Sequence, residues 1–318
     1  MSKQATSNKK KTRKKGKKKV TKHKDKQRKS QHKSKQNIKK KKKTLKCAPG
    51  REHKFTCYNS NALHELKDAW NEQYPDKRIN SNSPYEIWNY FHNHYKSACE
   101  NEKCWLRQSF IQHKLSTNLK KFTFAPDSPE SWKSNPKEWL SSDEIMDVMK
   151  QYENTHPDFV FLGPSPIDFE KKTLFNDCIW EDLCKFDLRQ YIDKGKTKIG
   201  IIFNLDTADK DGSHWVAAFI DTKRKGIYYY DSNGIHAPKR IKDFLHKVKQ
   251  QGQHKDVNIK FKIEQNTKEH QMKDGECGMF TMYFIINMLK KQSFKQFKRK
   301  FKGGGDGYMN QLINELFN

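Results

Sequence analysis

The sequence predicts an α+β fold in which helices cover a central mixed sheet and one helix is fully buried. Four runs rich in Ile, Val, Phe and Tyr have the composition of strands, and they are Lys198–Leu205, His214–Asp221, Gly226–Ser232 and Val257–Glu264. The run CGMFTMYFIINMLKK, which begins at Cys277, is apolar on nearly every face, as is typical of a helix at the centre of a domain. The order helix, strand, strand, strand, helix, strand, helix is that of an α+β arrangement around one sheet.

The elements next to the predicted sheet have recognisable ends. The helix before the strands has apolar residues at helical spacing, with Ser142 as its expected N-cap and Pro157 as its stop. The polar link DTKRKG between the second and third strands is short, which predicts an antiparallel hairpin. The amphipathic run PKRIKDFLHKVKQQG predicts a helix that ends at Gly252.

A smaller helical part, residues 47–125, precedes this region and is called the arm here. Its first helix carries apolar residues on one face, and Asn59 or Ser60 is the expected cap. Three prolines in the run TFAPDSPESWKSNPKEW indicate a linker at residues 126–138. The main domain is therefore expected at residues 139–318.

Charge is concentrated at the start of the chain. Residues 1–46 hold 23 Lys and Arg against one Asp, and so carry +22 of the formal net charge of +28. Such a segment cannot bury enough apolar surface to fold, which predicts a disordered polybasic tail. Because lysines bind phosphates through counterion release, DNA or another polyanion is the expected partner, with a solubilising or nuclear-localisation segment as the alternative. The tail is too charged for a secretory signal, and no apolar run is long enough to predict a membrane span.

Seven cysteines are spread along the chain, at positions 47, 57, 99, 104, 178, 184 and 277. An odd number in a long, lysine-rich chain argues against a secreted disulfide framework, so reduced thiols in a reducing compartment are expected. No CxxC pair occurs, and the spacing matches no compact structural zinc site.

Cys277 opens the buried helix and is followed at once by Gly278. The partial positive charge of a helix N-terminus favours a thiolate, and a glycine leaves room for a substrate backbone to approach. Considered alone, a buried inert cysteine is the commoner case. A nucleophile also needs a base within hydrogen-bond reach and a group that orients the base.

The predicted hairpin supplies such a pair. His214 begins the second strand and Asp231 lies at the end of the third, so the two should face each other across the hairpin. Gln271 lies six positions before Cys277, where its amide and the Cys277 backbone N–H could bind the oxyanion of a tetrahedral intermediate. A structural role is open for each residue separately, but four suitable groups in a suitable order favour catalysis.

The runs GSHWVAAFID, YYYDSNG and QMKDGECGMF resemble the ubiquitin-like-protein-specific cysteine protease family, which includes the adenovirus protease. The resemblance covers residues 139–318. It implies a papain-like fold, no cofactor, and a catalytic set of His214 as base, Asp231 as orienter, Gln271 as oxyanion donor and Cys277 as nucleophile. Asn233 is the alternative orienter, because some viral relatives use asparagine; a carboxylate stabilises the imidazolium better.

Two branches of this family are open. The arm, with its runs AWN and ACENEKCWL, is similar to the segment before the catalytic domain in proteases of large double-stranded DNA viruses. This favours an endopeptidase that cuts viral structural polyproteins after glycine during maturation, in the virion and the host-cell cytoplasm. The alternatives are a protease that removes ubiquitin-like modifiers and a nucleic-acid-binding protein with an inactive protease fold. The nucleus is the alternative location.

Overall fold

The computed structural model describes residues 45–111, 117–135, 138–301 and 303–318. All but the last two residues of the predicted polybasic tail lie outside these ranges. Residues 43–318 form one compact unit.

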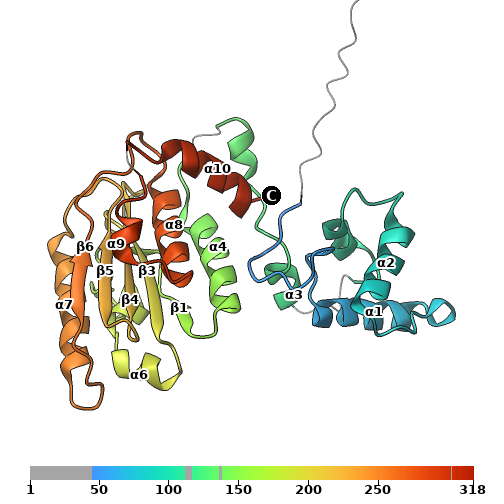
Figure 1. Cartoon of the computed structure of the whole chain (residues 1–318), viewed down its shortest axis with the longest axis horizontal. Helices are drawn as coiled ribbons and strands as arrows, with labels where there is room; N and C mark the ends of the chain where they lie inside the picture. Colours follow the sequence, from blue (N-terminus) through green and yellow to red (C-terminus); the bar gives the residue numbers. More distant parts are fainter. Residues whose placement is uncertain (1–44, 112–116, 136–137, 302) are drawn as a thin grey trace, which may run out of the picture. The chain divides into compact units, whose positions relative to one another are not determined.

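Helices and strands follow one another along this unit as shown in Figure 1. The helices are α1 (Ser60–Gln73), α2 (Pro84–Tyr95), α3 (Thr117–Phe122), α4 (Ser142–Thr155), α5 (Glu181–Cys184), α6 (Leu188–Asp193), α7 (Lys239–Gln253), α8 (Cys277–Leu289), α9 (Phe294–Phe297) and α10 (Asp306–Leu316). The strands are β1 (Phe159–Phe161), β2 (Ser165–Pro166), β3 (Lys198–Asn204), β4 (Trp215–Asp221), β5 (Gly226–Tyr230) and β6 (Lys262–Gln265). None of the helices in the described ranges is long and apolar enough to cross a membrane.

The strands form one mixed sheet, which confirms the predicted fold class. Its order is β1-β3-β4-β5-β6, with β2 also beside β3. β3, β4 and β5 are antiparallel, whereas β1 and β2 run parallel to β3 and β6 runs parallel to β5. The β4–β5 pair is the predicted hairpin, with Ala217 opposite Tyr230 and Asp221 opposite Gly226.

Both faces of the sheet are covered by helices, and β4 shows why. Along this strand Trp215, Ala217 and Phe219 belong to the cluster formed with α4 and α8, while Val216, Ala218 and Ile220 belong to the cluster formed with α7. A strand buried on both faces reads as a continuous apolar run, as this one does. α8 and α7 therefore lie on opposite faces of the sheet (Figure 1).

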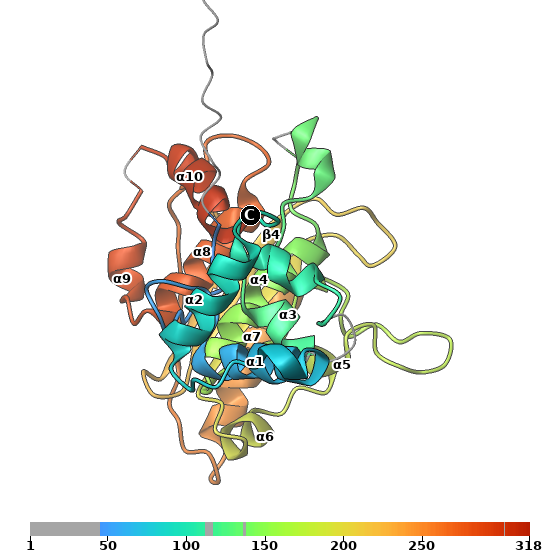
Figure 2. The same cartoon turned by 90° about the vertical axis from the view of Figure 1, so that its right-hand side faces the viewer.

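The arm has a hydrophobic cluster of its own, centred on α1 and α2. Figure 2 labels these two helices. Trp70 is 2% exposed there and packs edge-on against Phe91 and Phe110. Asn59 caps α1 by accepting a hydrogen bond from the Ala62 N–H, which settles the choice between Asn59 and Ser60.

Three details of the predicted elements were wrong. The N-cap of α4 is Ser141, in a capping box with Glu144, and Ser142 is already the first helical residue. The strand predicted at residues 257–264 begins only at Lys262, because Asn258 adopts a left-handed φ of 53° that interrupts an extended chain. α7 continues to Gln253, past Gly252.

The prediction of reduced cysteines was also wrong. Disulfides join Cys47 to Cys57, Cys99 to Cys104 and Cys178 to Cys184, with Cα atoms 5.1, 5.6 and 6.1 Å apart. Each pair is close in sequence, so local folding is enough to bring the two thiols together. The odd cysteine is Cys277, which is free and buried.

Candidate active site

The four candidate residues come from four different places in the catalytic fold. His214 directly precedes β4, Asp231 directly follows β5, Gln271 lies in the loop after β6, and Cys277 is the first residue of α8. α8 is buried along its whole length, so its N-terminus is held rigidly against the sheet. The sheet and this helix thus position a thiol, an imidazole, a carboxylate and a carboxamide.

His214 and Asp231 are in direct contact. His214 Nε2 lies 2.7 Å from Asp231 Oδ1, and the Asp231 side chain is almost completely buried. The predicted contact across the hairpin is therefore confirmed. The backbone N–H of Asn233 donates to the same carboxylate oxygen at 2.9 Å, so Asn233 supports Asp231 while Asp231 is the residue that contacts the imidazole.

Opposing effects act on the His214 imidazole. Burial lowers its pKa, but the hydrogen bonds that the ring makes to Asp231 and Cys277, together with its electrostatic interactions with these two groups, outweigh burial and raise the pKa from 6.5 to about 9. Because Nε2 faces Asp231, Nδ1 is the ring nitrogen left for the Cys277 thiol. An imidazolium beside a thiol favours the thiolate, which is the nucleophilic form.

Asn266 fixes the backbone that carries Asp231. Its Oδ1 accepts from the Asp231 N–H at 3.0 Å, and its Nδ2 donates to the Asp231 carbonyl at 2.6 Å. Asn266 is fully buried. This residue was not identified from the sequence, because it lies in a polar run with no distinctive spacing.

Gly278 makes room for protein rather than for substrate. A Cβ at this position would lie 3.0 Å from Leu140 Cδ1 and 3.4 Å from Trp215 Cδ1. Trp215 in turn donates its indole N–H to the Leu140 carbonyl at 3.0 Å. Leu140 and Trp215 thus pack against the start of α8, and Cys277 is only 3% exposed.

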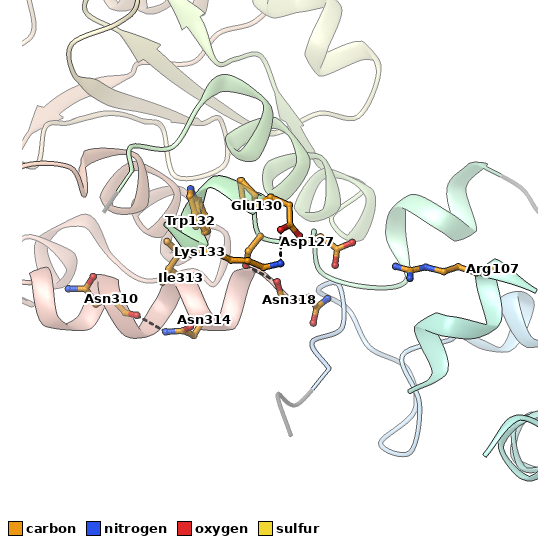
Figure 3. A pocket seen from close by; sticks show the side chains of 11 residues that line it. Arg107, Asp127, Glu130, Trp132, Lys133, Asn310, Ile313, Asn314 and Asn318 are labelled. Carbon is orange, nitrogen blue, oxygen red and sulfur yellow. Dashed lines mark hydrogen bonds and ion pairs between the residues drawn. The ribbon is translucent and has the colours of Figure 1, made fainter. Parts of the chain in front are cut away.

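Neither a metal-binding cluster nor the pocket of Figure 3 involves the four candidate residues in the described part of the chain. Within the described ranges, no group of three or more His, Cys, Asp or Glu side chains could hold a metal ion. A pocket of about 760 Å³ is lined by residues that include Arg107, Trp132 and Asn314, and it contains none of the four candidate residues (Figure 3). The pocket is therefore separate from the four candidate residues.

The Asp231→Asn substitution is expected to move the alkaline limit of peptide hydrolysis to lower pH. In the wild type, activity should fall as His214 loses its proton near pH 9; without the Asp231 charge the pKa of His214 falls, so activity is lost at lower pH. The pH profile of kcat/KM measures this. Asn233→Ala should leave the alkaline limit of kcat/KM unchanged. If Asn233→Ala shifts this limit and Asp231→Asn does not, the orienting role belongs to Asn233.

Glu276, next to Cys277, forms a carboxyl pair with Asp306 of α10. Burial, followed by the hydrogen bond and charge of Asp306, raises the pKa of Glu276 to about 7; Asn310 and Lys273 act in the opposite direction. The Asp306 carboxylate also accepts from the Met272 and Lys273 N–H groups at 3.1 to 3.2 Å. The contact between Glu276 and Asp306 therefore holds the Gln271–Glu276 loop against α10. This contact is strongest when Glu276 is protonated, because two carboxylates repel each other.

Stability should consequently fall as pH rises through this range. Between pH 4.5 and about 7 the folded protein holds a proton on Glu276 that the unfolded chain has lost, so the free energy of unfolding decreases with pH. The partial exposure of Glu276 limits the effect to on the order of 1 kcal/mol. Thermal unfolding from pH 4.5 to 8 should show this decrease in the wild type and a smaller one in Glu276→Gln. Equal slopes in the two proteins would contradict the assignment.

Comparisons with known proteins agree with this geometry. The model of the Ulp1 protease family, C-terminal catalytic domain, matches residues 194–304, which include all four candidate residues. An Acanthamoeba polyphaga mimivirus protein named as a thiol protease is 30% identical over 271 residues, covering 78% of this chain and 85% of that protein.

A second set of relatives comes from African swine fever virus. A cysteine protease of that virus is 26% identical over 166 residues, which is 50% of this chain and 60% of the viral protein. The crystal structure of an African swine fever virus protease has the same fold, with a TM-score of 0.58 and 18% identity over 86% of this chain and 96% of that one. The chain thus belongs to the ubiquitin-like-protein-specific, Ulp1-type cysteine protease family found in large DNA viruses, and it is a cysteine peptidase.

Proposed function

We propose that this protein is a thiol endopeptidase with Cys277 as nucleophile, and that it cuts viral structural polyproteins after glycine during virion maturation. The observation that carries the catalytic part is the 2.7 Å contact between His214 and Asp231, together with the hydrogen bond of His214 to Cys277, the one free cysteine among the described residues. In this assignment His214 acts as the acid and base, Asp231 orients it, and Gln271 binds the oxyanion.

The proposed roles give the following reaction. The Cys277 thiolate attacks the scissile carbonyl carbon, and the new oxyanion is bound by the Gln271 amide and the Cys277 backbone N–H. The His214 imidazolium gives its proton to the leaving amine, and the C–N bond breaks to leave a thioester. Neutral His214 then takes a proton from water, which attacks the thioester and releases the carboxylate product and the thiol.

Narrow access to the thiol supports glycine at the cleavage site. Cys277 is 3% exposed, and Leu140 and Trp215 pack around the start of its helix. A residue without a side chain can bring its carbonyl close to the sulfur in such a space. The viral origin of the relatives supports a polyprotein substrate and action in the virion and host-cell cytoplasm.

A protease for ubiquitin-like modifiers is the second candidate, because some African swine fever virus relatives are named SUMO-1 cysteine proteases. The two candidates differ in what they recognise. A maturation protease reads a short extended peptide, whereas a deconjugating enzyme also needs the folded surface of the modifier.

The deciding experiment compares unstructured Gly-Gly-X peptides with fusions in which a folded ubiquitin-like domain precedes the same bond. The maturation role predicts that kcat/KM for the best peptides equals or exceeds that for the fusions. Cys277→Ala, which should be inactive, is the negative control for both substrates. Cleavage confined to fusions with a folded modifier would favour the deconjugating role. Failure to cleave either substrate, together with salt-sensitive DNA binding, would favour a binding protein with an inactive protease fold.

The basic tail is proposed to bind DNA or another polyanion and to be dispensable for peptide cleavage. Deletion should stop at residue 42, because the Lys46 carbonyl accepts from the Ala125 N–H and the Lys46 N–H donates to Asn318. This deletion still removes 21 of the 23 Lys and Arg residues of the tail.

The shortened protein should keep its peptide kcat/KM and lose most of its DNA affinity near physiological salt. In full-length protein that affinity should fall steeply as salt rises. Loss of peptide cleavage in a folded deletion variant, or equal DNA binding by both proteins, would contradict the proposed role of the tail.

A further inference from the structure

Ser232 is a buried hydroxyl at the end of β5 with one side-chain partner. Its side chain is completely inaccessible, and its Oγ donates to Gln271 Oε1 at 2.7 Å. The Ser232 carbonyl also accepts from the His270 N–H at 2.7 Å and the Gln271 N–H at 3.1 Å. Three hydrogen bonds therefore connect this single residue to the segment that carries Gln271.

The hydrogen bonds define which way the Gln271 carboxamide faces. Gln271 Nε2 donates to the Lys273 carbonyl at 2.7 Å, and a carbonyl can only accept. Oε1 must then face Ser232, whose hydroxyl supplies the proton. With both ends held, the amide plane is fixed, and within the described part of the chain the second Nε2–H has no acceptor of its own.

The two anchors of the carboxamide differ in rigidity. Lys273 is exposed and belongs to the loop before α8, whereas Ser232 is buried and lies two residues after β5, a strand that is buried at every position. The neighbouring Asp231 is clamped by Asn266 and contacts His214. Asp231 thus contacts His214, and the next residue, Ser232, contacts Gln271.

We propose that Ser232 is a positioning residue which locks the Gln271 carboxamide so that an N–H, and not the carbonyl oxygen, meets the oxyanion. This inference rests on the proposed oxyanion role of Gln271. Without the Ser232 hydroxyl, the carboxamide keeps only the Lys273 contact and can rotate about it. The donor then has to be ordered during the reaction, which raises the barrier to the tetrahedral intermediate.

The test compares two variants that each remove one buried hydroxyl. Ser232→Ala should lower kcat roughly tenfold with KM nearly unchanged, in the range expected for a residue that supports a reacting group. Tyr230→Phe is the matched control: it removes the Tyr230 hydroxyl contact to His270 Nδ1 at 3.1 Å and leaves both side-chain hydrogen bonds of Gln271 in place. Tyr230→Phe should keep both constants. Equal losses in the two variants would mean a general structural effect and would overturn the proposal.

A pair of inhibitors separates positioning from structural damage. A peptide aldehyde adds to the Cys277 sulfur and turns its carbonyl oxygen into an oxyanion, whereas iodoacetamide forms an S–C bond, releases iodide and makes no oxyanion. Ser232→Ala should weaken aldehyde inhibition roughly tenfold and leave the rate of alkylation at Cys277 unchanged. Unchanged aldehyde affinity would overturn the proposal. If the alanine variant fails to fold, Ser232→Cys, of similar volume and a weaker donor, takes its place.

Gln271→Ala distinguishes failure of this inference from failure of the proposed function. In that background Ser232→Ala should have no further effect on kcat, because the donor it positions is absent. If Gln271→Ala lowers kcat and Ser232→Ala does not, Gln271 keeps its role and Ser232 has none. If Gln271→Ala itself leaves kcat unchanged, the oxyanion assignment fails, and the positioning role fails with it.

Discussion

Replacing Cys277 by alanine is expected to abolish peptide hydrolysis while the protein stays folded. Loss of the nucleophile from a catalytic set costs about 10⁶ in kcat, which is below detection in an ordinary peptide assay. The side chain lost is small, and Cys277 lies at the start of α8 rather than in its middle, so the cost in stability is modest. Turnover and the thermal unfolding midpoint should be measured on the same preparation.

The matched control removes two other cysteines. Cys99→Ala combined with Cys104→Ala eliminates one disulfide of the arm and leaves the main domain unaltered. This variant should lose stability and retain kcat. Turnover that persists in Cys277→Ala would contradict a thiol mechanism, and loss of kcat in the folded disulfide variant would show that the arm takes part in catalysis.

Gln271→Ala is expected to lower kcat by about 10² to 10³ and to leave KM nearly unchanged. This is the usual cost of one oxyanion donor, and it affects kcat because the donor binds charge that develops only in the transition state. Steady-state kinetics on a Gly-Gly-X peptide measure both constants. The Ser232 hydroxyl would lose its partner, so the variant should also be slightly less stable.

Gln250→Ala is a suitable control, because Gln250 is an exposed glutamine on α7. It should have wild-type constants. A rise in KM with unchanged kcat in Gln271→Ala would instead identify Gln271 as a substrate-binding residue and place the oxyanion donor elsewhere.

Sequence reasoning worked where local pattern fixes long-range geometry. The short link between β4 and β5 leaves little choice of register, so the positions of His214 and Asp231 along the chain predicted their contact. An apolar run without a polar face could only be a buried helix, and α8 is buried along its whole length.

Prediction from the sequence failed where the structure depends on contacts between residues that are far apart in the chain. β1 and β2 have three and two residues, too few for a recognisable pattern, and they are strands only because β3 pairs with them. The link from Ser232 to Gln271 joins residues 39 positions apart, and neither residue type signals the other. The cysteine count gave the wrong expectation because one free thiol made the total odd.

The most direct test of the central claim is to map the adduct of a glycine-containing peptide vinyl sulfone by mass spectrometry. The sulfur of an activated cysteine adds to the vinyl carbon and stays attached, so the modified residue is the nucleophile. The assignment of the site predicts one adduct, at Cys277, that is lost in His214→Ala and after unfolding. An adduct on another residue, or labelling of Cys277 that is equally fast in His214→Ala, would contradict it.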